Sequence, residues 1–212
     1  LAGEWQASGP LALAFVEFHR FTAISYKLPL VDALVGAALL LADLNGIERA
    51  GHVRDKLSWL VGYAETLRAL VEASASRFKC HWNGTAVPDA LTVNIAKMHF
   101  ATNYHAAVAR VQDIAGGTLA TAPSGADLEI PVVGDWVRRS LLGRVGTDAI
   151  DRLRALNLAS DLTASDFGGY QEVLAIHAEG SIEAQKLTIL RQYDANSVRT
   201  YARQLAGIEG TV

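Results

Sequence analysis

The chain has 212 residues, half of them apolar, which is enough for one substantial hydrophobic core and too few for two. Its formal net charge is −3 and charges of both signs are interleaved, which argues against nucleic acid as a partner. The single cysteine, Cys80, excludes an internal disulfide framework and favours a reducing, cytoplasmic location.

No membrane segment is expected. The longest apolar run, residues 31–44, contains Asp32 and Asp43 and is shorter than the roughly 20 residues of a membrane span. The chain opens with Leu1 and its first ten residues show no basic segment followed by a cleavage site. We interpret this start as a cut through a longer polypeptide, or as a processed subunit.

Helical periodicity dominates the first half of the chain. Residues 11–23 and 31–45 are predicted to be helical, with an interruption at Pro29 and a stop at Asn45 and Gly46, which tolerate a left-handed conformation. The second of these helices is apolar on nearly every face, so other elements must enclose it.

Two further helices follow. Residues 53–71 show the clearest amphipathic spacing in the chain, residues 80–89 have the composition of a loop, and residues 93–114 repeat the same helical period. The second helix is expected to end at Gly116 and Gly117.

The second half is less regular. Residues 118–146 predict an irregular excursion with at most a short helix near Trp136, and residues 148–163 are again helical. A glycine pair at 168 and 169 is expected to interrupt or bend the chain before a last helix over residues 182–205, capped by Ser181. No segment has the pattern of a paired strand. The sequence predicts an all-α antiparallel helical bundle that forms a single domain over residues 1–212.

Polar groups in the first apolar region are candidates for chemistry. His19 and Tyr26 would share a face of a continuous helix, and Lys27 follows directly. The alternative is a hydrogen-bonded core histidine and a lysine that extends to solvent.

Two later stretches are suited to a polar ligand. Gln112, Gly116 and Gly117 combine an amide with residues that let a pyrophosphate approach the backbone, although a plain helix C-cap explains them as well. The stretch from Ser165 through Asp166, Phe167, Gly168 and Gly169 offers a hydroxyl, a carboxylate and backbone amides, with a helix kink as the alternative. The histidines have no metal-ligand spacing, so no metal site is expected. The residues alone leave the function open.

At these same stretches the sequence resembles the C-terminal domain of the 4-hydroxyphenylacetate 3-hydroxylases and the related 4-hydroxybutyryl-CoA dehydratases. The likeness covers nearly the whole chain. The segments that carry it are residues 19–21 with 26–27, 36–46, 52–57, 112–117 with 123–124, 163–169, and 180–181 with 184–185.

The resemblance implies an acyl-CoA-dehydrogenase-like bundle, preceded in the full protein by a helical domain and a β domain that this chain does not contain. In that family FAD lies between the β domain and the bundle, and neighbouring subunits of a tetramer complete the site. By analogy Gln112, Gly116 and Gly117 lie near flavin or a subunit contact, and residues 166–169 help to hold the cofactor.

The two branches of the family predict different chemistry. His19 and Lys27 match the dehydratase pattern, in which a histidine and a nearby cysteine ligate a [4Fe-4S] cluster. Tyr26 occupies the cysteine position here, so no iron–sulfur cluster is expected. Residues 163–169 resemble the hydroxylase branch, in which a separate reductase delivers reduced flavin.

Three hypotheses follow. In the first, the chain is part of an aromatic monooxygenase that uses reduced FAD, with His19 and Lys27 as catalytic residues beside the flavin. The second is a cluster-free CoA-ester dehydratase or isomerase, in which His19 is a base or acid. The third is a non-catalytic bundle that assembles subunits. A homo-oligomer, with a tetramer as the expected form, is common to all three.

Overall fold

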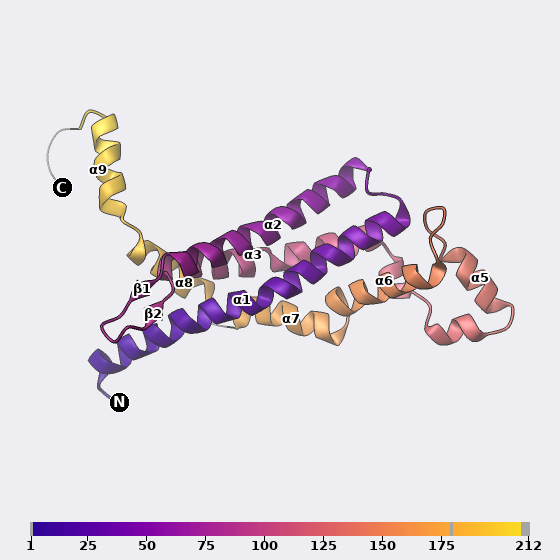
Figure 1. Ribbon diagram of the computed structural model, residues 1–212, viewed down its shortest axis with the longest axis horizontal. Helices are drawn as coiled ribbons and strands as arrows, with labels where there is room; N and C mark the ends of the chain where they lie inside the picture. Colours follow the sequence, from indigo (N-terminus) through magenta and orange to yellow (C-terminus); the bar gives the residue numbers. More distant parts are fainter. Residues whose placement is uncertain (1, 179, 209–212) are drawn as a thin grey trace.

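Three long helices form the centre of the molecule and run side by side in alternating directions (Figure 1). They are α1 (Trp5–Asn45), α2 (Gly51–Ser76) and α3 (Ala90–Ala115). Helices α6 (Ala149–Thr163), α7 (Asp166–His177) and α8 (Ile182–Gln192) pack on α3, and α6 also contacts α1. The computed structural model describes residues 2–178 and 180–208. The predicted all-α bundle is confirmed.

Helix α1 is continuous, so the predicted interruption at Pro29 is wrong. A proline inside a helix removes one backbone hydrogen bond and costs about 3 kcal/mol. Here Lys27, Val31 and Leu34 are buried on both sides of the proline. Packing against the neighbouring helices therefore holds the two halves in line. The predicted stop is confirmed, because Gly46 has φ 67° and donates its N–H to the end of the helix.

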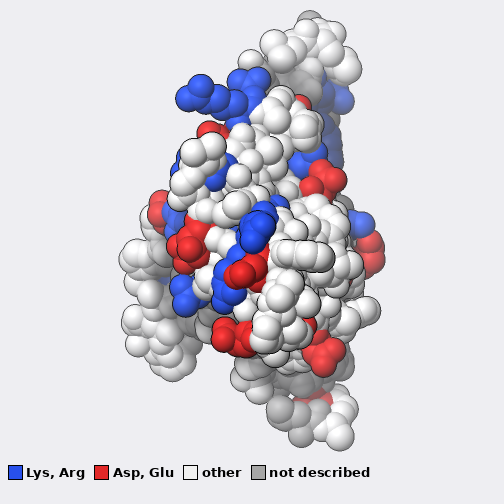
Figure 2. Space-filling model, turned by 90° about the vertical axis from the view of Figure 1, so that its right-hand side faces the viewer, with Lys and Arg blue, Asp and Glu red and all other residues white. Residues whose placement is uncertain are grey.

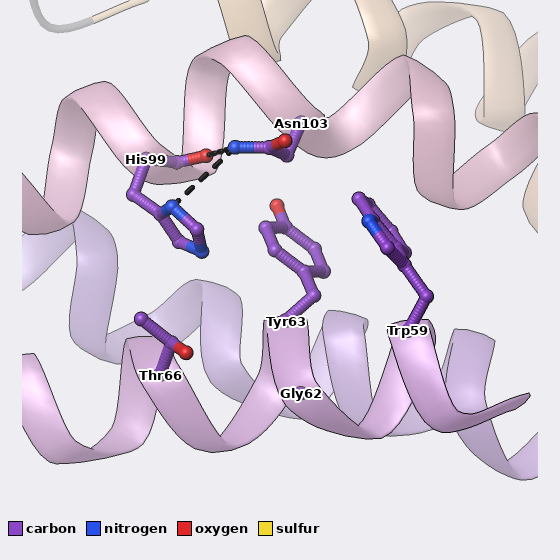
Figure 3. Close-up of a pocket in the computed structure, with 6 residues that line it drawn as sticks. All are labelled: Trp59, Gly62, Tyr63, Thr66, His99 and Asn103. Carbon is purple, nitrogen blue, oxygen red and sulfur yellow. Dashed lines mark hydrogen bonds between the residues drawn. The ribbon is translucent and has the colours of Figure 1, made fainter.

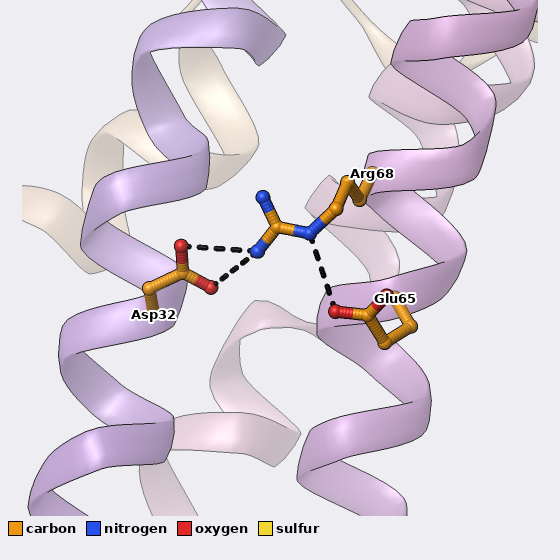
Figure 4. Close-up of polar contacts among 3 residues, drawn as sticks. All are labelled: Asp32, Glu65 and Arg68. Atoms are coloured by element: carbon orange, nitrogen blue, oxygen red, sulfur yellow. Dashed lines mark hydrogen bonds and ion pairs between the residues drawn. The ribbon is translucent and has the colours of Figure 1, made fainter.

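Among the described residues, α1 is the one helix long and apolar enough to cross a membrane, by length and composition only. In its second half the apolar side chains of Val31, Leu34 and Leu41 are buried in the bundle. Asp32 lies on the outer side, where Arg68 of α2 donates to both of its oxygens at 2.8 and 3.1 Å and to Glu65 at 3.2 Å (Figure 4). The second half of α1 is therefore apolar because it is a central helix of the bundle.

The predicted amphipathic helices are α2 and α3, which both extend a few residues beyond the predicted limits. The loop between them contains a small antiparallel hairpin of β1 (Lys79–Cys80) and β2 (Ala86–Val87), so the expectation of no paired strand is wrong. Its turn runs from His81 to Gly84, where the Gly84 N–H donates to the His81 carbonyl at 2.9 Å. Gly84 has φ 81°, the left-handed conformation that commonly follows a turn in a three-residue hairpin loop.

Residues 118–146 contain more helix than predicted. The short helix around Trp136 is α5 (Val133–Ser140), and α4 (Thr118–Thr121) and the 3₁₀ turn η1 (Gly125–Glu129) precede it. Ser124 and Asp127 form a capping box that starts η1. This end of the bundle is shown in Figure 2, where acidic and basic side chains are interspersed with uncharged surface.

The last helices differ from prediction in two places. The glycine pair does not break the chain, because Ser165 caps α7 and both glycines lie in its first turn. The last predicted helix is two helices, since Tyr193 is extended and Asp194 caps α9 (Ala195–Leu205) by accepting from Ser197. Ser181 caps α8 as predicted. Helix α9 buries no residue and points away from the bundle (Figure 1).

Candidate functional site

Polar side chains with almost no solvent access gather where α1, α3 and α8 meet. They are Arg20 (5 % exposed), Lys27 (3 %), Asn94, Lys97 and Gln185 (each 0 %). Lysine and arginine are almost never fully buried without a partner, so this arrangement is a specific feature of the fold. We call these five residues the buried polar cluster.

Direct contacts tie the cluster to three elements. Arg20 donates to the side-chain oxygen of Asn94, and Asn94 donates to the carbonyl of Ala90 at 2.7 Å. Gly180 lies against the guanidinium, since a Cβ there would be 3.0 Å from a terminal nitrogen of Arg20. Gly180 has φ 90°, a conformation that favours glycine. The approach to Arg20 therefore depends on glycine at this position.

The two lysines of the cluster share one aromatic ring. The Lys27 ammonium lies 4.8 Å from the centre of the Phe100 ring and the Lys97 ammonium lies 5.6 Å from it. Lys97 also donates to the carbonyl of Ala175 in α7 at 3.2 Å. Cation–π contact stabilises charge most strongly when water is excluded, as it is here. Phe100 therefore helps to hold two positive charges inside the bundle.

Gln185 supplies an acceptor to the same region. Its amide nitrogen donates to Gly180 at 3.4 Å, while its buried side-chain oxygen has no hydrogen-bond partner among the described residues. An unpaired buried acceptor is costly and marks a place where a donor is missing.

The structure places the two predicted catalytic residues in different surroundings. Lys27 belongs to the buried cluster, whereas His19 is exposed and stacks on Phe15 at 5.3 Å. The alternative of a core histidine and a solvent-reaching lysine is wrong for both residues. Tyr26 is 60 % exposed, so it lies outside while the next residue points inward.

Sequence reasoning missed four members of the cluster and a nearby carboxyl group. Burial raises the pKa of Glu17, although His81, Lys79 and Arg20 act in the opposite direction. A signal for Lys97 was present, because it lies on the apolar stripe of α3, four residues after Val93. A charged residue at a core position of an amphipathic helix indicates either a buried ion pair or a functional site.

The predicted cofactor residues meet at a second place. The Gln112 amide donates to the carbonyl of Thr163 at 2.7 Å, which joins the end of α3 to the end of α6. Gly116 and Gly117 are exposed, and a Cβ on either would meet no atom within 4 Å. Because Gly116 has φ 73°, it ends α3 without strain.

The start of α7 completes this place, which we call the glycine junction: Gln112, Gly116, Gly117 and residues 163–169. Asp166, Phe167 and Gly169 are exposed. Gly168 is buried, and a Cβ there would lie 2.9 to 3.0 Å from the backbone of Leu162 and Thr163. Gly168 thus has a packing role, because it lets α7 turn closely onto the end of α6.

The buried polar cluster and the glycine junction are far apart. Phe100, which contacts Lys27, and Gly116 are separated by 16 positions of one helix, or about 24 Å at about 1.5 Å per residue. The structure therefore brings the predicted cofactor residues together and leaves the predicted catalytic residues elsewhere.

A pocket of about 250 Å³ opens between α2 and α3 on the outer face (Figure 3). It is lined by Trp59, Gly62, Tyr63, Thr66, His99 and Asn103. The Asn103 amide nitrogen lies 3.4 Å from Nδ1 of His99, while the buried Nε2 has no hydrogen-bond partner in the part of the chain that the structure describes. The His99 ring lies tilted against Tyr63 at 5.5 Å. Burial lowers the pKa of His99 and raises that of Tyr63.

A larger pocket of about 450 Å³ lies beside the glycine junction. It is lined by Thr118, Pro123, Val133, Trp136, Val137, Ser140 and Leu141. We call it the Trp136 pocket. Its first lining residue directly follows Gly117 in the chain.

The helical arrangement is that of the acyl-CoA-dehydrogenase-like C-terminal bundle. The chain belongs to the HpaB family, described as 4-hydroxyphenylacetate 3-hydroxylase C terminal, which matches residues 9–207. The resemblance seen in the sequence is confirmed.

Relatives come from both branches of the family. The 4-hydroxybutyryl-CoA dehydratase/vinylacetyl-CoA-Δ-isomerase of Clostridium aminobutyricum is 30 % identical over 99 % of this chain and 44 % of its own length. The oxygen-tolerant archaeal 4-hydroxybutyryl-CoA dehydratase of N. maritimus has a TM-score of 0.87 and 31 % identity, over 99 % of this chain and 42 % of its own.

An oxygenase of the other branch has the same fold. The oxygenase component of 4-hydroxyphenylacetate 3-monooxygenase, complexed with FAD, superposes with a TM-score of 0.83 and 24 % identity, over 91 % of this chain and 40 % of its own. The chain thus spans less than half the length of these proteins. Within residues 2–178 and 180–208, no group of three or more His, Cys, Asp or Glu side chains is placed to hold a metal ion.

Proposed function

We propose that this chain is the C-terminal helical domain of a flavin-dependent oxidoreductase, of the aromatic monooxygenase type that uses reduced FAD. The observation that carries the proposal is the family match over residues 9–207. The buried polar cluster adds support, since a family bundle with a catalytic surface would keep charges such as Lys27 in fixed positions.

The glycine junction fits a dinucleotide. No side chain of Gly116 or Gly117 obstructs the approach of a pyrophosphate to the end of α3, and open space surrounds both. We assign Gln112, Gly116, Gly117 and residues 166–169 to this role, with Gln112 acting through its bond to Thr163. Bound reduced flavin would supply the reaction with oxygen.

The proposed catalytic residues would act in different ways. Lys27 would present a fixed positive charge, because its ammonium is held beside Phe100 inside the bundle. His19 lies on the exposed side of α1, so its imidazole is accessible to a neighbouring domain and can exchange a proton there.

The rest of the enzyme is also part of the proposal. We assign the missing functions to an N-terminal helical and β region, to other copies in a tetramer, and to a separate flavin reductase. Exposed apolar side chains on the first half of α1 suit such contacts. They include Trp5 (74 % exposed), Leu11 (62 %) and Phe15 (64 %). A cytoplasmic location stays a prediction.

A second candidate is a CoA-ester dehydratase or isomerase with His19 as base or acid. The observation that favours it is the dehydratase relative, which aligns with 99 % of the chain. Tyr26 stands at the position of the family's cysteine, and the single thiol of the sequence, Cys80, is exposed on the hairpin. A cluster-free reaction therefore suits this branch best.

The first experiment is an anaerobic titration of the 212-residue chain with reduced FAD, oxidised FAD and butyryl-CoA, followed by absorbance and calorimetry. Saturable binding of reduced FAD supports the oxygenase proposal, and binding of butyryl-CoA without reduced FAD favours the dehydratase. Light scattering on the same samples gives the molar mass. A stable oligomer that binds neither ligand would contradict both and leave the non-catalytic bundle.

A further inference from the structure

Gly62 stands in the middle of α2, where no feature of the described residues requires a glycine. Glycine weakens the interior of a helix relative to alanine. Its backbone here lies outside the left-handed region, and a Cβ would meet no atom within 4 Å. The missing side chain leaves room in the pocket between α2 and α3, which we call the α2–α3 pocket (Figure 3). This room is available to a group from outside the described chain.

A fixed row of rings forms one wall of the α2–α3 pocket. The rings of His99, Tyr63 and Trp59 follow one another, with 5.5 Å between the centres of each neighbouring pair. Arg110 closes the row, with its guanidinium 3.8 Å from the centre of the Trp59 ring. The Tyr63 hydroxyl donates to the Phe100 carbonyl at 3.1 Å, so the backbone of α3 holds the central ring. An apolar ring that enters meets a wall already in place, which lowers the entropic cost of binding.

Hydrogen-bonding groups lie unused at the His99 end of this row. The Asn103 amide nitrogen donates to the His99 carbonyl at 2.8 Å and lies 3.4 Å from Nδ1 of the same residue. Nδ1 is therefore the acceptor, and the neutral imidazole carries its proton on Nε2, which has no partner among the described residues. Figure 3 shows Nε2 on the side of the ring that faces Tyr63 and Thr66. The Thr66 hydroxyl also makes no hydrogen bond within the described chain, so one ligand hydroxyl can accept from Nε2 and donate to Thr66.

The α2–α3 pocket favours a small and neutral ligand. No Asp, Glu, Lys or Arg lines it, so a charged group would lose hydration without gaining an opposite charge from the lining. Burial lowers the pKa of His99 and raises that of Tyr63, so both side chains are neutral at pH 7. The volume of about 250 Å³ lies below the range of about 300 to 1,000 Å³ that is typical of sites for drug-sized molecules. It suits a single ring with one short substituent.

We propose that the α2–α3 pocket binds a small neutral aromatic alcohol, with its ring against Tyr63 and its hydroxyl at Thr66 and His99. This site goes beyond the proposed function, because it needs no flavin and lies apart from the glycine junction. His99 and Gly116 are separated by 17 positions along α3 and its cap, or about 25 Å at about 1.5 Å per residue. The domain would thus bind an aromatic compound independently of a cofactor.

The experiment titrates the 212-residue chain with benzyl alcohol, toluene and benzoate, followed by saturation-transfer NMR. The three ligands are similar in size, but toluene lacks the hydroxyl and benzoate is charged. We expect benzyl alcohol to bind more tightly than toluene by about 2- to 12-fold, the equivalent of one hydrogen bond. Benzoate should bind more weakly than either, because the lining offers it no opposite charge.

Three variants test the site itself. Gly62→Leu fills the pocket and should abolish binding of benzyl alcohol and toluene, while leucine is well tolerated in a helix. Gly36→Leu is the matched control, because Gly36 is also an exposed glycine inside a long helix and its Cβ would meet nothing within 4 Å. It should leave both affinities unchanged. Thr66→Val keeps the volume but removes the hydroxyl, so it should lower the affinity for benzyl alcohol to that for toluene. Circular dichroism and the unfolding midpoint show whether each variant is folded.

Three results would overturn the proposal. Benzyl alcohol that binds equally well to the wild type and to Gly62→Leu would lie elsewhere on the chain. Equal affinities of the wild type for benzyl alcohol and toluene would mean that no hydrogen bond selects the ligand. The third result is absence of binding to the wild type, and a smaller molar mass of Gly62→Leu in light scattering would then assign this face to a contact between copies of the chain. Each result leaves flavin binding untouched, so the proposed function is judged by its own titration.

Discussion

The buried polar cluster and the glycine junction are built in opposite ways. The cluster consists of long charged and amide side chains that are almost inaccessible to water. The junction has exposed backbone at Gly116 and Gly117, and the open, largely apolar Trp136 pocket lies beside it. The cluster holds its charges in place through contacts within the protein, whereas the region around the junction leaves a space that a ligand can fill.

This difference indicates how the bundle divides its tasks. Burying cations such as Lys97 costs several kcal/mol of desolvation per charge, so stability alone does not explain the cluster. The tight contacts at the junction and in the neighbouring helix α5 are between backbone segments, at Gly168 and Gly134 respectively. They set the position of helices rather than of charges. Mutations should therefore act through lost side-chain contacts in the cluster and through helix displacement at the junction.

The largest effect is expected at Phe100, which is 1 % exposed and contacts both buried lysines. Phe100→Ala should lower the free energy of unfolding by about 3 to 5 kcal/mol, measured by urea denaturation. Phe100→Leu keeps most of the volume, so a loss beyond about 1.5 kcal/mol reports the cation–π contacts. Phe15→Ala, on the exposed half of α1, should change the stability by no more than about 0.5 kcal/mol. Equal effects at Phe15 and Phe100 would contradict the buried cluster.

A glycine pair tests the junction. Gly168→Ala places a methyl group against the backbone of Leu162 and Thr163, and should destabilise the chain by about 1 to 3 kcal/mol. Gly169→Ala is the matched control, because its Cβ meets nothing within 4 Å, and it should be neutral or stabilise the helix by up to about 1 kcal/mol. Thermal unfolding followed by circular dichroism measures both. A Gly168→Ala protein as stable as Gly169→Ala would show that α7 does not need this close contact.

Much of the fold could be predicted because it depends on local pattern. The apolar spacing of α2 and α3 and the caps at Gly46 and Ser181 are properties of neighbouring residues, and all were confirmed. The continuity of α1 through Pro29 was missed, because it depends on the helices that pack around it.

The site was predictable to a smaller extent. The stretches of the glycine junction were identified from glycines and family resemblance, but the bond that joins Gln112 to Thr163 spans 51 positions and has no local signal. Arg20 and Gln185 were missed because burial of a polar residue is decided by distant helices. Lys97 was the exception, since its place on an apolar stripe was visible.

The Gln112 bond gives an intermediate effect at the junction. Gln112→Leu removes the donor to the Thr163 carbonyl and should cost about 1 to 2 kcal/mol in urea denaturation. Gln204→Leu, at an exposed position of α9, is the control and should have little effect. If Gln112 instead contacts flavin only, its replacement will leave the stability of the ligand-free chain unchanged.

The smallest effect concerns Glu17, which tests how far the low-dielectric surroundings of the cluster extend along α1. Burial raises its pKa in the folded chain above the ordinary value of 4.5. The folded state then binds more protons than the unfolded state just above that pH, so stability is fully present below it and falls as pH rises through the folded-state pKa. Urea denaturation from about pH 4 to about pH 7 should show this fall in the wild type and a weaker one in Glu17→Gln. Glu183→Gln on the exposed face of α8 controls for the loss of one negative charge. Identical pH profiles for the wild type and Glu17→Gln would place Glu17 in water-like surroundings and confine the cluster to the residues that α3 and α8 cover.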